Sequence, residues 1–226
     1  MELRSERLQE RAKRKILIVD DHPILRKGLS MLINQEPDLV VDGEAEDARK
    51  ALEAIETIRP DMVIVDISLP GIDGVELLKS IKLRYGDLPT LVVSMHDESL
   101  FAERALRAGA RGYVMKQEAL DNVLVAIRRV LAGEIFVSNK IATKMLERMV
   151  DSDSKTVTSP IDLLSDRELT VFRLIGQGQT TRQIAEKLHL SVKTVESYRS
   201  HIKEKLKLGG GTDLLKYAIQ WVQGNS

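Results

Sequence analysis

The stretch VIVDISLPGIDG, Val63–Gly74, joins a short apolar run to an aspartate and then to a Pro-Gly turn. The apolar residues are mostly β-branched, which is typical of a strand buried on both faces of a parallel sheet. An ionised carboxylate loses its hydration when it is buried, so Asp66 at the end of this strand needs a group that compensates its charge. The stretch therefore predicts a buried parallel strand with a polar site at its carboxyl end.

Apolar runs of the same kind recur along the chain: KILIV at 15–19, LVVDG at 39–43, TLVVS at 90–94 and GYVM at 112–115. Between and after these runs, apolar residues follow a helical period, which predicts five helices. Five strands alternating with five helices indicate a doubly wound, flavodoxin-like α/β domain with a five-stranded parallel sheet, whose ligands lie beyond the carboxyl ends of the strands. We therefore expect Asp66 in the ligand-binding crevice.

The rest of the chain predicts helices only. The segment 134–160 contains one expected helix, at 136–150, followed by DSDSKTVTSP, whose hydroxyls and low hydrophobicity indicate a flexible linker. Beyond the linker we expect an all-α domain of four helices over 161–226. Their starts are marked by the capping patterns Ser165-x-x-Glu168 and Thr180-x-x-Gln183, by Ser191, and by Thr212 or Asp213 after the LGGG break.

The composition bounds the class of protein. A chain of 226 residues suggests two domains. Because there is no cysteine, disulfides and thiolate metal sites are excluded, and the four histidines show no ligand spacing, so a zinc site is not expected. No apolar run approaches the roughly 18 residues of a membrane helix, so we expect a cytoplasmic protein with no membrane partner. Residues 1–14 are a charged N-terminal extension to which we assign no role.

The charges are distributed unevenly. The formal net charge of the chain is zero, but it is −5 over residues 15–133 and +3 over residues 161–226. An acidic first domain and a mildly basic second one suggest one module that handles cations and another that meets polyanions. Random charge drift explains the asymmetry equally well.

Polar side chains follow four of the five expected strands. Asp20 and Asp21 follow the first, Asp66 the third and Lys116 the fifth, while Ser94 ends the fourth. Each alone has an ordinary interpretation as a turn residue, a helix cap or a surface lysine. Together they suggest a carboxylate cluster that binds Mg²⁺ through oxygen ligands, with Asp66 as a nucleophile that accepts a phosphoryl group.

The motifs VDDH, VDISLPGIDG, VVSMH and GYVMK make residues 15–133 resemble the receiver domain of bacterial two-component response regulators. The resemblance implies that a sensor histidine kinase phosphorylates Asp66. It also implies that magnesium is held by Asp21 and Asp66, by Asp20 through water, and by the backbone carbonyl of Ser68. Lys116 and Ser94 would hold the phosphoryl oxygens.

The same resemblance implies that Tyr113 is a switch residue, whose side chain fills the space left when Ser94 moves toward the phosphate. The alternative for Tyr113 is an aromatic side chain that simply covers the sheet. In many receivers a proline in a cis peptide follows the lysine, whereas Gln117 follows Lys116 here. Because a cis bond to a non-proline residue costs roughly 3 kcal/mol, the geometry of this loop is left open.

The segment TTRQIAEKLHLSVKTVESYRSHIKEKLKL, residues 180–208, has the spacing of a helix-turn-helix, with a turn at His189 and Leu190. A plain amphipathic helix with solvated charges is the alternative. With LSDRELTVFRLIGQGQT before it and an apolar helix after it, residues 161–223 resemble the LuxR-type DNA-binding domain, and the whole chain resembles the NarL/FixJ family of response regulators.

The resemblance implies that Glu196, Ser197 and Ser200 reach base edges, and that phosphates are contacted by Lys193, Thr194, Tyr198, Arg199 and Lys203. Glu196 can accept a hydrogen bond from cytosine N4, or it only pairs with Arg199 or Lys193. The final helix carries Leu214, Leu215, Ala218 and Ile219 on one face. That face is either core or, as the resemblance favours, a dimer contact.

The function expected is that of a non-enzymatic transcriptional regulator that takes part in its own phosphorylation and dephosphorylation. Its partners would be a sensor histidine kinase, double-stranded DNA, a second copy when phosphorylated or DNA-bound, and RNA polymerase. A haloacid-dehalogenase-type phosphatase is one competitor, but Ser68 and His22 stand where it needs a second acid. A receiver that signals without phosphorylation is the other.

Overall fold

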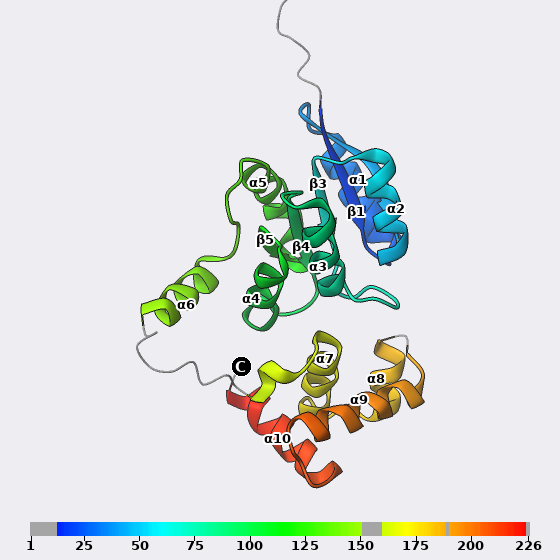
Figure 1. The fold of residues 1–226 in the computed structure, drawn as a ribbon, viewed down its shortest axis with the longest axis vertical. Helices are drawn as coiled ribbons and strands as arrows, with labels where there is room; N and C mark the ends of the chain where they lie inside the picture. The colour runs from blue at the N-terminus through cyan, green and yellow to red at the C-terminus, as the bar shows by residue number, and fades with distance from the viewer. Residues whose placement is uncertain (1–12, 151–159, 189, 225–226) are drawn as a thin grey trace, which may run out of the picture. The chain divides into compact units, whose positions relative to one another are not determined.

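The computed structural model describes residues 13–150, 160–188 and 190–224 (Figure 1), and the chain forms two compact units, Met1–Asp151 and Ser152–Ser226. Most of the N-terminal extension, His189 of the expected turn, and all of the expected linker except Pro160 lie outside the described residues.

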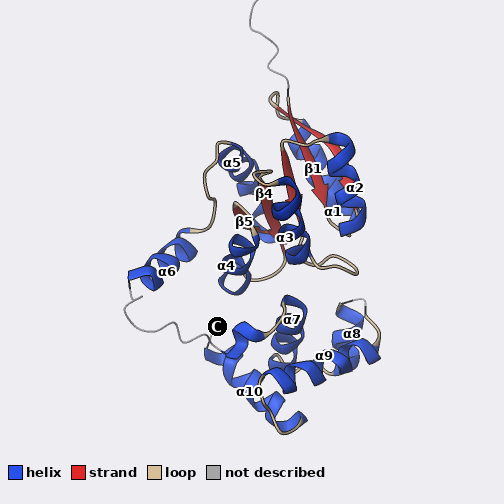
Figure 2. Ribbon diagram, in the orientation of Figure 1, coloured by secondary structure: helices blue, strands red, loops and turns tan. Residues whose placement is uncertain are grey.

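The first unit is a parallel sheet of five strands in the order β2-β1-β3-β4-β5. The strands are β1 (Arg14–Val19), β2 (Leu39–Ala45), β3 (Met62–Val65), β4 (Thr90–Ser94) and β5 (Gly112–Met115). The helices are α1 (Pro23–Asn34), α2 (Ala48–Ile58), α3 (Gly74–Tyr85), α4 (Glu98–Ala108) and α5 (Ala119–Leu131). This alternation confirms the doubly wound α/β fold, and Figure 2 shows the sheet enclosed by helices.

Two layers of helices cover the sheet. On one face, α1 and α5 bury a cluster that includes Ile16, Ile18 and Ile64 from the strands. Helices α2, α3 and α4 pack side by side on the other face. Because both faces are covered, the strands read as continuous apolar runs, and all four residues of β3 are buried.

The segment after α5 also belongs to the first unit. Phe136 lies beside β5: its carbonyl accepts from the backbone N–H of Tyr113 at 2.8 Å, and its own N–H donates to the carbonyl of Arg111 at 2.9 Å. Ser138 then donates to Glu98 of α4 at 2.6 Å. Helix α6 (Asn139–Val150) follows and packs against α4, with Ile141 buried.

The described part of the second unit contains helices and no strand. After the short turn η2 (Pro160–Leu163) come α7 (Asp166–Gly176), α8 (Thr181–Lys187), α9 (Val192–Lys205) and α10 (Gly211–Gly224). The predicted capping boxes at Ser165 and Thr180 are both present, and Ser191 caps α9. The predicted cap of the last helix was wrong, because α10 begins at Gly211, before Thr212 and Asp213, and its first-turn bond runs from Leu214 N–H to Gly210 O at 3.1 Å.

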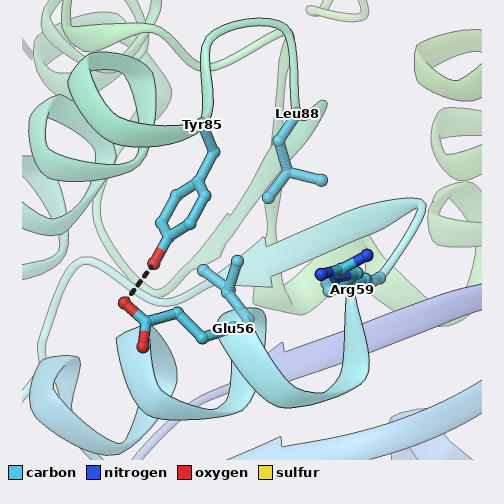
Figure 3. A pocket seen from close by; sticks show the side chains of 6 residues that line it. Glu56, Arg59, Tyr85 and Leu88 are labelled. Atoms are coloured by element: carbon cyan, nitrogen blue, oxygen red, sulfur yellow. Dashed lines mark hydrogen bonds between the residues drawn. The ribbon is translucent and has the colours of Figure 1, made fainter.

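A surface hollow of about 490 Å³ lies at the amino ends of β3 and β4 (Figure 3). It is lined by Ile55, Glu56, Arg59, Pro60, Tyr85 and Leu88. The Tyr85 hydroxyl donates to Glu56 at 3.2 Å, and partial burial together with this carboxylate raises the pKa of Tyr85. The hollow is at the opposite edge of the sheet from Asp66. Within the described residues, no helix is both long enough and apolar enough to cross a membrane.

Candidate phosphorylation site and DNA-binding surface

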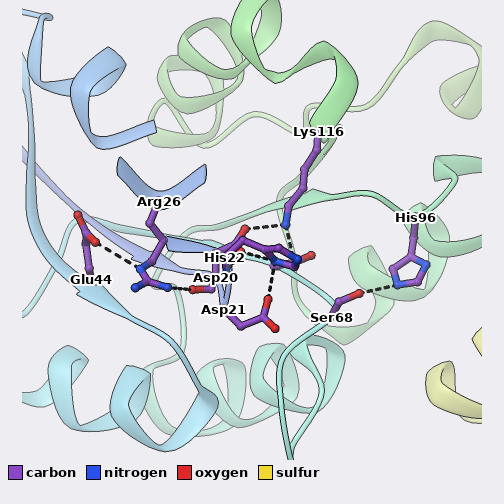
Figure 4. Close-up of polar contacts among 9 residues, drawn as sticks. Asp20, Asp21, His22, Arg26, Glu44, Ser68, His96 and Lys116 are labelled. Carbon is purple, nitrogen blue, oxygen red and sulfur yellow. Dashed lines mark hydrogen bonds and ion pairs between the residues drawn. The ribbon is translucent and has the colours of Figure 1, made fainter. Parts of the chain in front are cut away.

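Three carboxylates meet at the carboxyl ends of β1 and β3. These strands are neighbours, with Val19 paired in register to Val65, so that Asp20 and Asp66 follow them side by side. Asp20 is 2% exposed and Asp66 is 1% exposed. Ligand atoms of Asp20, Asp21, His22 and Asp66 all lie within 4.8 Å of one another (Figure 4). The structure therefore brings together the carboxylates that the strand pattern grouped.

Lys116 lies between two of these carboxylates. Its Nζ is 2.8 Å from Asp66 Oδ2 and 2.7 Å from Asp20 Oδ2, and its side chain is 5% exposed. Burial alone acts to lower the pKa of Lys116, but the nearby charges of Asp66 and Asp20 outweigh it and raise this pKa. The ammonium group therefore stays charged and holds one oxygen of Asp66.

The loop that carries Lys116 starts with a single 3₁₀ turn, η1 (Lys116–Glu118). Within the described residues every peptide bond is trans, including the one between Lys116 and Gln117. The loop geometry that the sequence left open is thus a trans bond, and the lysine still reaches the carboxylates.

Two oxygens of the cluster are not satisfied by the protein. Asp66 Oδ1 and Asp21 Oδ1 are buried and have no hydrogen-bond partner among the described residues. His22 Nδ1 is 2.6 Å from Asp21 Oδ1, but this contact does not have hydrogen-bond geometry. It is an ion pair only when the imidazole is protonated. Buried carboxylate oxygens without donors are the ligands that a hard divalent cation takes, so this acidic pocket is compatible with divalent metal binding.

His22 lies against these aspartates, a contact that the sequence analysis did not anticipate. Its Nδ1 lies 3.1 Å from Asp20 Oδ1, and its backbone N–H donates to the same oxygen at 2.8 Å. The grouping depends on the turn between β1 and α1, which folds the ring back over the preceding aspartates. Spacing rules for histidine ligands do not describe such a turn.

Ser94, Tyr113 and Ser68 are connected through His96. Ser94 and Tyr113 are buried, and burial raises the pKa of the Tyr113 hydroxyl. The Tyr113 hydroxyl donates to the carbonyl of His96 at 2.9 Å, and the His96 backbone N–H donates to Ser94 Oγ at 3.3 Å. The His96 ring places Nε2 2.8 Å from Ser68 Oγ, across the mouth of the site. Tyr113 therefore occupies an inward position beside Ser94.

The chain returns to α3 immediately beneath Asp66. Asp73 caps this helix by accepting from the backbone N–H of Glu76 at 3.0 Å, and Gly74 N–H donates to Ile67 O at 2.9 Å. A Cβ on Gly74 would lie 2.1 Å from the carbonyl oxygen of Asp66. Only glycine allows the helix to start this close to the phosphoacceptor candidate.

Arg26 is a site residue that the sequence analysis missed. From α1 its Nη1 donates to the backbone carbonyl of Asp20, and its Nε lies 3.3 Å from Glu44 Oε2 on β2. The Arg26 side chain is 14% exposed. These contacts stabilise the turn that carries Asp20 and Asp21. Arg26 lies on an ordinary amphipathic helix, so the sequence alone did not indicate this contact.

In the second unit, α9 packs against α7 and α8 and buries Val195 and Ile202. Of the candidate DNA contacts, Lys193, Glu196, Ser197 and Ser200 are exposed, and Thr194, Tyr198, Arg199 and Lys203 are half-buried. The structure therefore places the base-edge candidates on the solvent side of the helix.

Several of these candidates also make contacts within the chain. Thr194 N–H donates to the capping hydroxyl of Ser191 at 3.0 Å. Arg199 Nε lies 3.9 Å from Glu196 Oε2, a long contact on an exposed carboxylate. Such a pair is weak, so it does not decide between pairing and base reading for Glu196.

The candidate dimer face on α10 is divided. Leu214 and Ala218 are fully buried within the unit, so they belong to its core. Leu215 is 41% exposed and Ile219 is half-buried, so these two remain accessible. Gly176 of α7 lets α10 approach, because a Cβ there would lie 2.4 Å from the carbonyl oxygen of Ala218. Of the four candidates, Leu215 and Ile219 are therefore the two that a dimer contact could use.

The family descriptions match both units. Residues 16–128 match the response regulator receiver domain, and residues 162–218 match the bacterial regulatory proteins of the luxR family. The oxygen regulatory protein NreC of Staphylococcus haemolyticus is 36% identical over 210 residues, which cover 91% of this chain and 97% of NreC. The chain belongs to the LuxR-type response regulators. It is a two-component response regulator with a receiver domain and a LuxR-type DNA-binding domain.

Solved structures of response regulators agree with this assignment. A two-component response regulator of the LuxR family from Aurantimonas sp. SI85-9A1 is 38% identical with a TM-score of 0.57, covering 62% of this chain and 100% of that one. RcsB from Salmonella enterica serovar Typhimurium, bound to promoter rprA in the presence of the phosphomimetic BeF₃⁻, is 27% identical with a TM-score of 0.57. That match covers 91% of this chain and 98% of RcsB.

Proposed function

We propose that a sensor histidine kinase phosphorylates Asp66, and that the phosphoryl group controls dimerisation and sequence-specific DNA binding. The observation that carries the proposal is the state of the Asp66 carboxylate: Lys116 holds one oxygen, and the other is buried without a partner among the described residues. Such a carboxylate is held in one orientation and keeps one oxygen free to react. In this scheme residues 15–133 form the receiver, 134–160 a helix and linker, and 161–226 the DNA-binding domain.

In the transfer step a carboxylate oxygen of Asp66 attacks the phosphorus of a phosphohistidine. A P–O bond forms, the P–N bond breaks, and the departing imidazole takes up a proton. Lys116 and the hydroxyl of Ser94 then donate to the oxygens of the acyl phosphate. The regulator takes part in its own phosphorylation through these donors, and hydrolysis of the acyl phosphate restores the carboxylate.

The residues that would hold Mg²⁺ are Asp21 and Asp66, with Asp20 acting through water and Ser68 through its carbonyl. Bound there, the cation neutralises charge that develops on the phosphoryl oxygens. The buried oxygens of Asp21 and Asp66 that have no hydrogen-bond partner among the described residues support this assignment. The imidazole of His22 beside them is not an oxygen ligand, so we give it no part in holding magnesium.

On phosphorylation, Ser94 moves toward the phosphoryl group and Tyr113 follows it further inward. The connection of both residues to His96 provides the route by which the start of α4 responds. The charge of roughly −2 added at Asp66 shifts the population toward this state. The chain then dimerises, and two copies of α9 enter the major grooves of paired half-sites.

In the DNA complex, Glu196, Ser197 and Ser200 read base edges, and the remaining candidates on α9 contact phosphates. The exposure of the first three supports this division. The RcsB structure with promoter DNA supports DNA binding by this chain, since RcsB resembles it over most of its length. Contact with RNA polymerase on the promoter completes the proposal.

Replacement of Asp66 by Asn tests the first step. The full chain is treated with acetyl phosphate and Mg²⁺ and analysed on a phosphate-affinity gel and by DNA-binding titration. Wild type and Asp87→Asn, which alters an exposed aspartate, should both shift on the gel and gain DNA affinity. Asp66→Asn should do neither.

Three results would contradict the proposal. A gain of DNA affinity in Asp66→Asn would move the phosphoacceptor elsewhere. A wild-type chain that binds DNA but never shifts on the gel would indicate a receiver that signals without phosphorylation. Steady release of phosphate from small esters would indicate a phosphatase.

A further inference from the structure

The buried carboxylate of Glu168 ties the start of α7 to another helix. Glu168 is 4% exposed although it is charged. Its Oε2 accepts from the backbone N–H of Ser165 at 2.7 Å, and its own N–H donates to Ser165 Oγ at 3.3 Å. This capping box fixes the position of the carboxylate at the positive end of the helix dipole.

The same oxygen is shared with the recognition helix candidate α9. Lys205 Nζ donates to Glu168 Oε2 at 2.6 Å, and His201 Nδ1 lies 3.8 Å from Glu168 Oε1. Burial acts to raise the pKa of Glu168, but the contacts with Lys205 and Ser165 outweigh it and lower this pKa. Glu168 is therefore ionised near neutral pH, and its ion pair with Lys205 persists.

The ion pair lies on one flank of α9. At 3.6 residues per turn, His201 and Lys205 fall on one side of the buried stripe formed by Val195 and Ile202. Glu196 and Ser200 fall on the other side, so a rotation of α9 about its axis would carry them away from their present direction. An apolar stripe alone tolerates such a rotation better than a fixed ion pair does, because hydrophobic contact is not directional.

We infer that Glu168 and Lys205 are positioning residues for DNA reading: their pair fixes the rotation of α9, and Lys205 is thereby withheld from DNA phosphates. The inference rests on the proposed function of α9 in the major groove. Lys203 lies in the same last turn and has no acidic partner among the described residues, so it is the matched lysine that is available to DNA.

The test uses the full chain treated with acetyl phosphate and Mg²⁺. Two labelled duplexes are compared, one selected from a random pool by the wild-type chain and one scrambled to the same composition. Binding is followed by fluorescence anisotropy at increasing KCl for Lys205→Met and Lys203→Met. The slope of log K against log salt counts phosphate contacts, and the affinity ratio of the two duplexes measures base reading.

Lys203→Met should flatten the salt slope by about 0.9 and weaken both duplexes alike. Lys205→Met should leave the slope unchanged and reduce the affinity ratio by about tenfold, the equivalent of one charge-assisted contact. Lys205→Arg should restore the ratio. Glu168→Gln should reduce the ratio as Lys205→Met does, and the double variant should lose no more than either single variant.

A fall of about 0.9 in the slope of Lys205→Met would overturn the inference, because Lys205 would then contact a phosphate. An unchanged affinity ratio would overturn it as well. If Lys205→Met fails to fold, Glu168→Gln with Lys205→Met replaces it, since this pair leaves no unpaired buried charge. If the wild-type chain selects no duplex from the pool, the proposed function itself fails. If the wild-type chain selects a duplex but Lys205→Met has an altered salt slope, only the inference about Lys205 is rejected.

Discussion

Gly74→Ala should damage the proposed phosphorylation site without changing a polar side chain. The added Cβ would lie 2.1 Å from the carbonyl oxygen of Asp66 and 2.7 Å from the Cα of Ile67. Both are backbone atoms, so no flexible side chain can move aside. Separations below 3.0 Å essentially do not occur for a real Cβ, so the first gap must open by roughly 1 Å.

The expected cost has two parts. Overpacking typically destabilises by about 1–3 kcal/mol, and we place this substitution near 3 kcal/mol because backbone must shift. A displacement of about 1 Å at a reacting group lowers a rate on the order of 100-fold, so phosphorylation of Asp66 should slow by that factor. The second effect should persist under conditions in which the variant is fully folded.

The matched control is Gly28→Ala on α1. No atom lies within 4 Å of a Cβ at Gly28, so this substitution should stabilise the helix by up to about 1 kcal/mol. Trp221 is the only tryptophan of the chain and lies in α10, so its fluorescence reports the DNA-binding domain alone. Urea unfolding followed by circular dichroism then identifies the receiver as the transition that Trp221 does not follow, and acetyl phosphate labelling gives the rate.

The reasoning is refuted if Gly74→Ala unfolds at the urea concentration of wild type and is labelled at the wild-type rate. A loss of stability with an unchanged labelling rate would show that α3 moves and Asp66 does not. In that case the close approach would matter for packing and not for the geometry of the site.

Two further predictions concern Glu168 and Arg26. Because the folded-state pKa of Glu168 is lowered, the ionised carboxylate stabilises the fold above the unfolded value near 4.5, and this stabilisation is lost as the pH falls through the folded value. The urea midpoint of the transition that Trp221 reports should therefore decrease at pH values below about 4.5. It should fall less in Glu168→Gln, which has no carboxylate to protonate at this position. Arg26→Gln removes the brace on the Asp20 carbonyl and should weaken Mg²⁺ binding by about tenfold or more, measured by calorimetric titration. Arg49→Gln, which breaks only an exposed pair with Glu53, should leave Mg²⁺ binding unchanged, and an equal loss in both variants would refute the role of Arg26.

Much of the fold could be predicted because its signals are local. The five strands are continuous apolar runs, and the capping boxes at Ser165 and Thr180 are four-residue patterns. Each can therefore be predicted from a few consecutive residues, without knowledge of the tertiary contacts. The start of α10 was mispredicted because glycines precede it, and a helix can begin at Gly211 without a side-chain cap. The division of the α10 apolar face into core and accessible residues also required the packing against α7.

In the candidate site, too, some features have a local sequence signal and others depend on packing. Asp20, Asp21, Asp66 and Lys116 could be grouped from sequence, because parallel strands place their carboxyl ends at one edge of a sheet. The contacts of His22, Arg26 and His96 could not, since they depend on how turns and helices direct side chains across that edge.

The amino-acid sequence by itself determined the α/β domain, the helical domain and the residues that we propose for the phosphoryl chemistry, because burial patterns and helix caps act over a few neighbouring residues. Only the tertiary structure decided which oxygen of Asp66 Lys116 holds, why residue 74 is glycine, and which lysine of α9 is paired with Glu168. Those choices are made by distances of a few ångströms between segments far apart in the chain, and such distances exist only after the helices have packed.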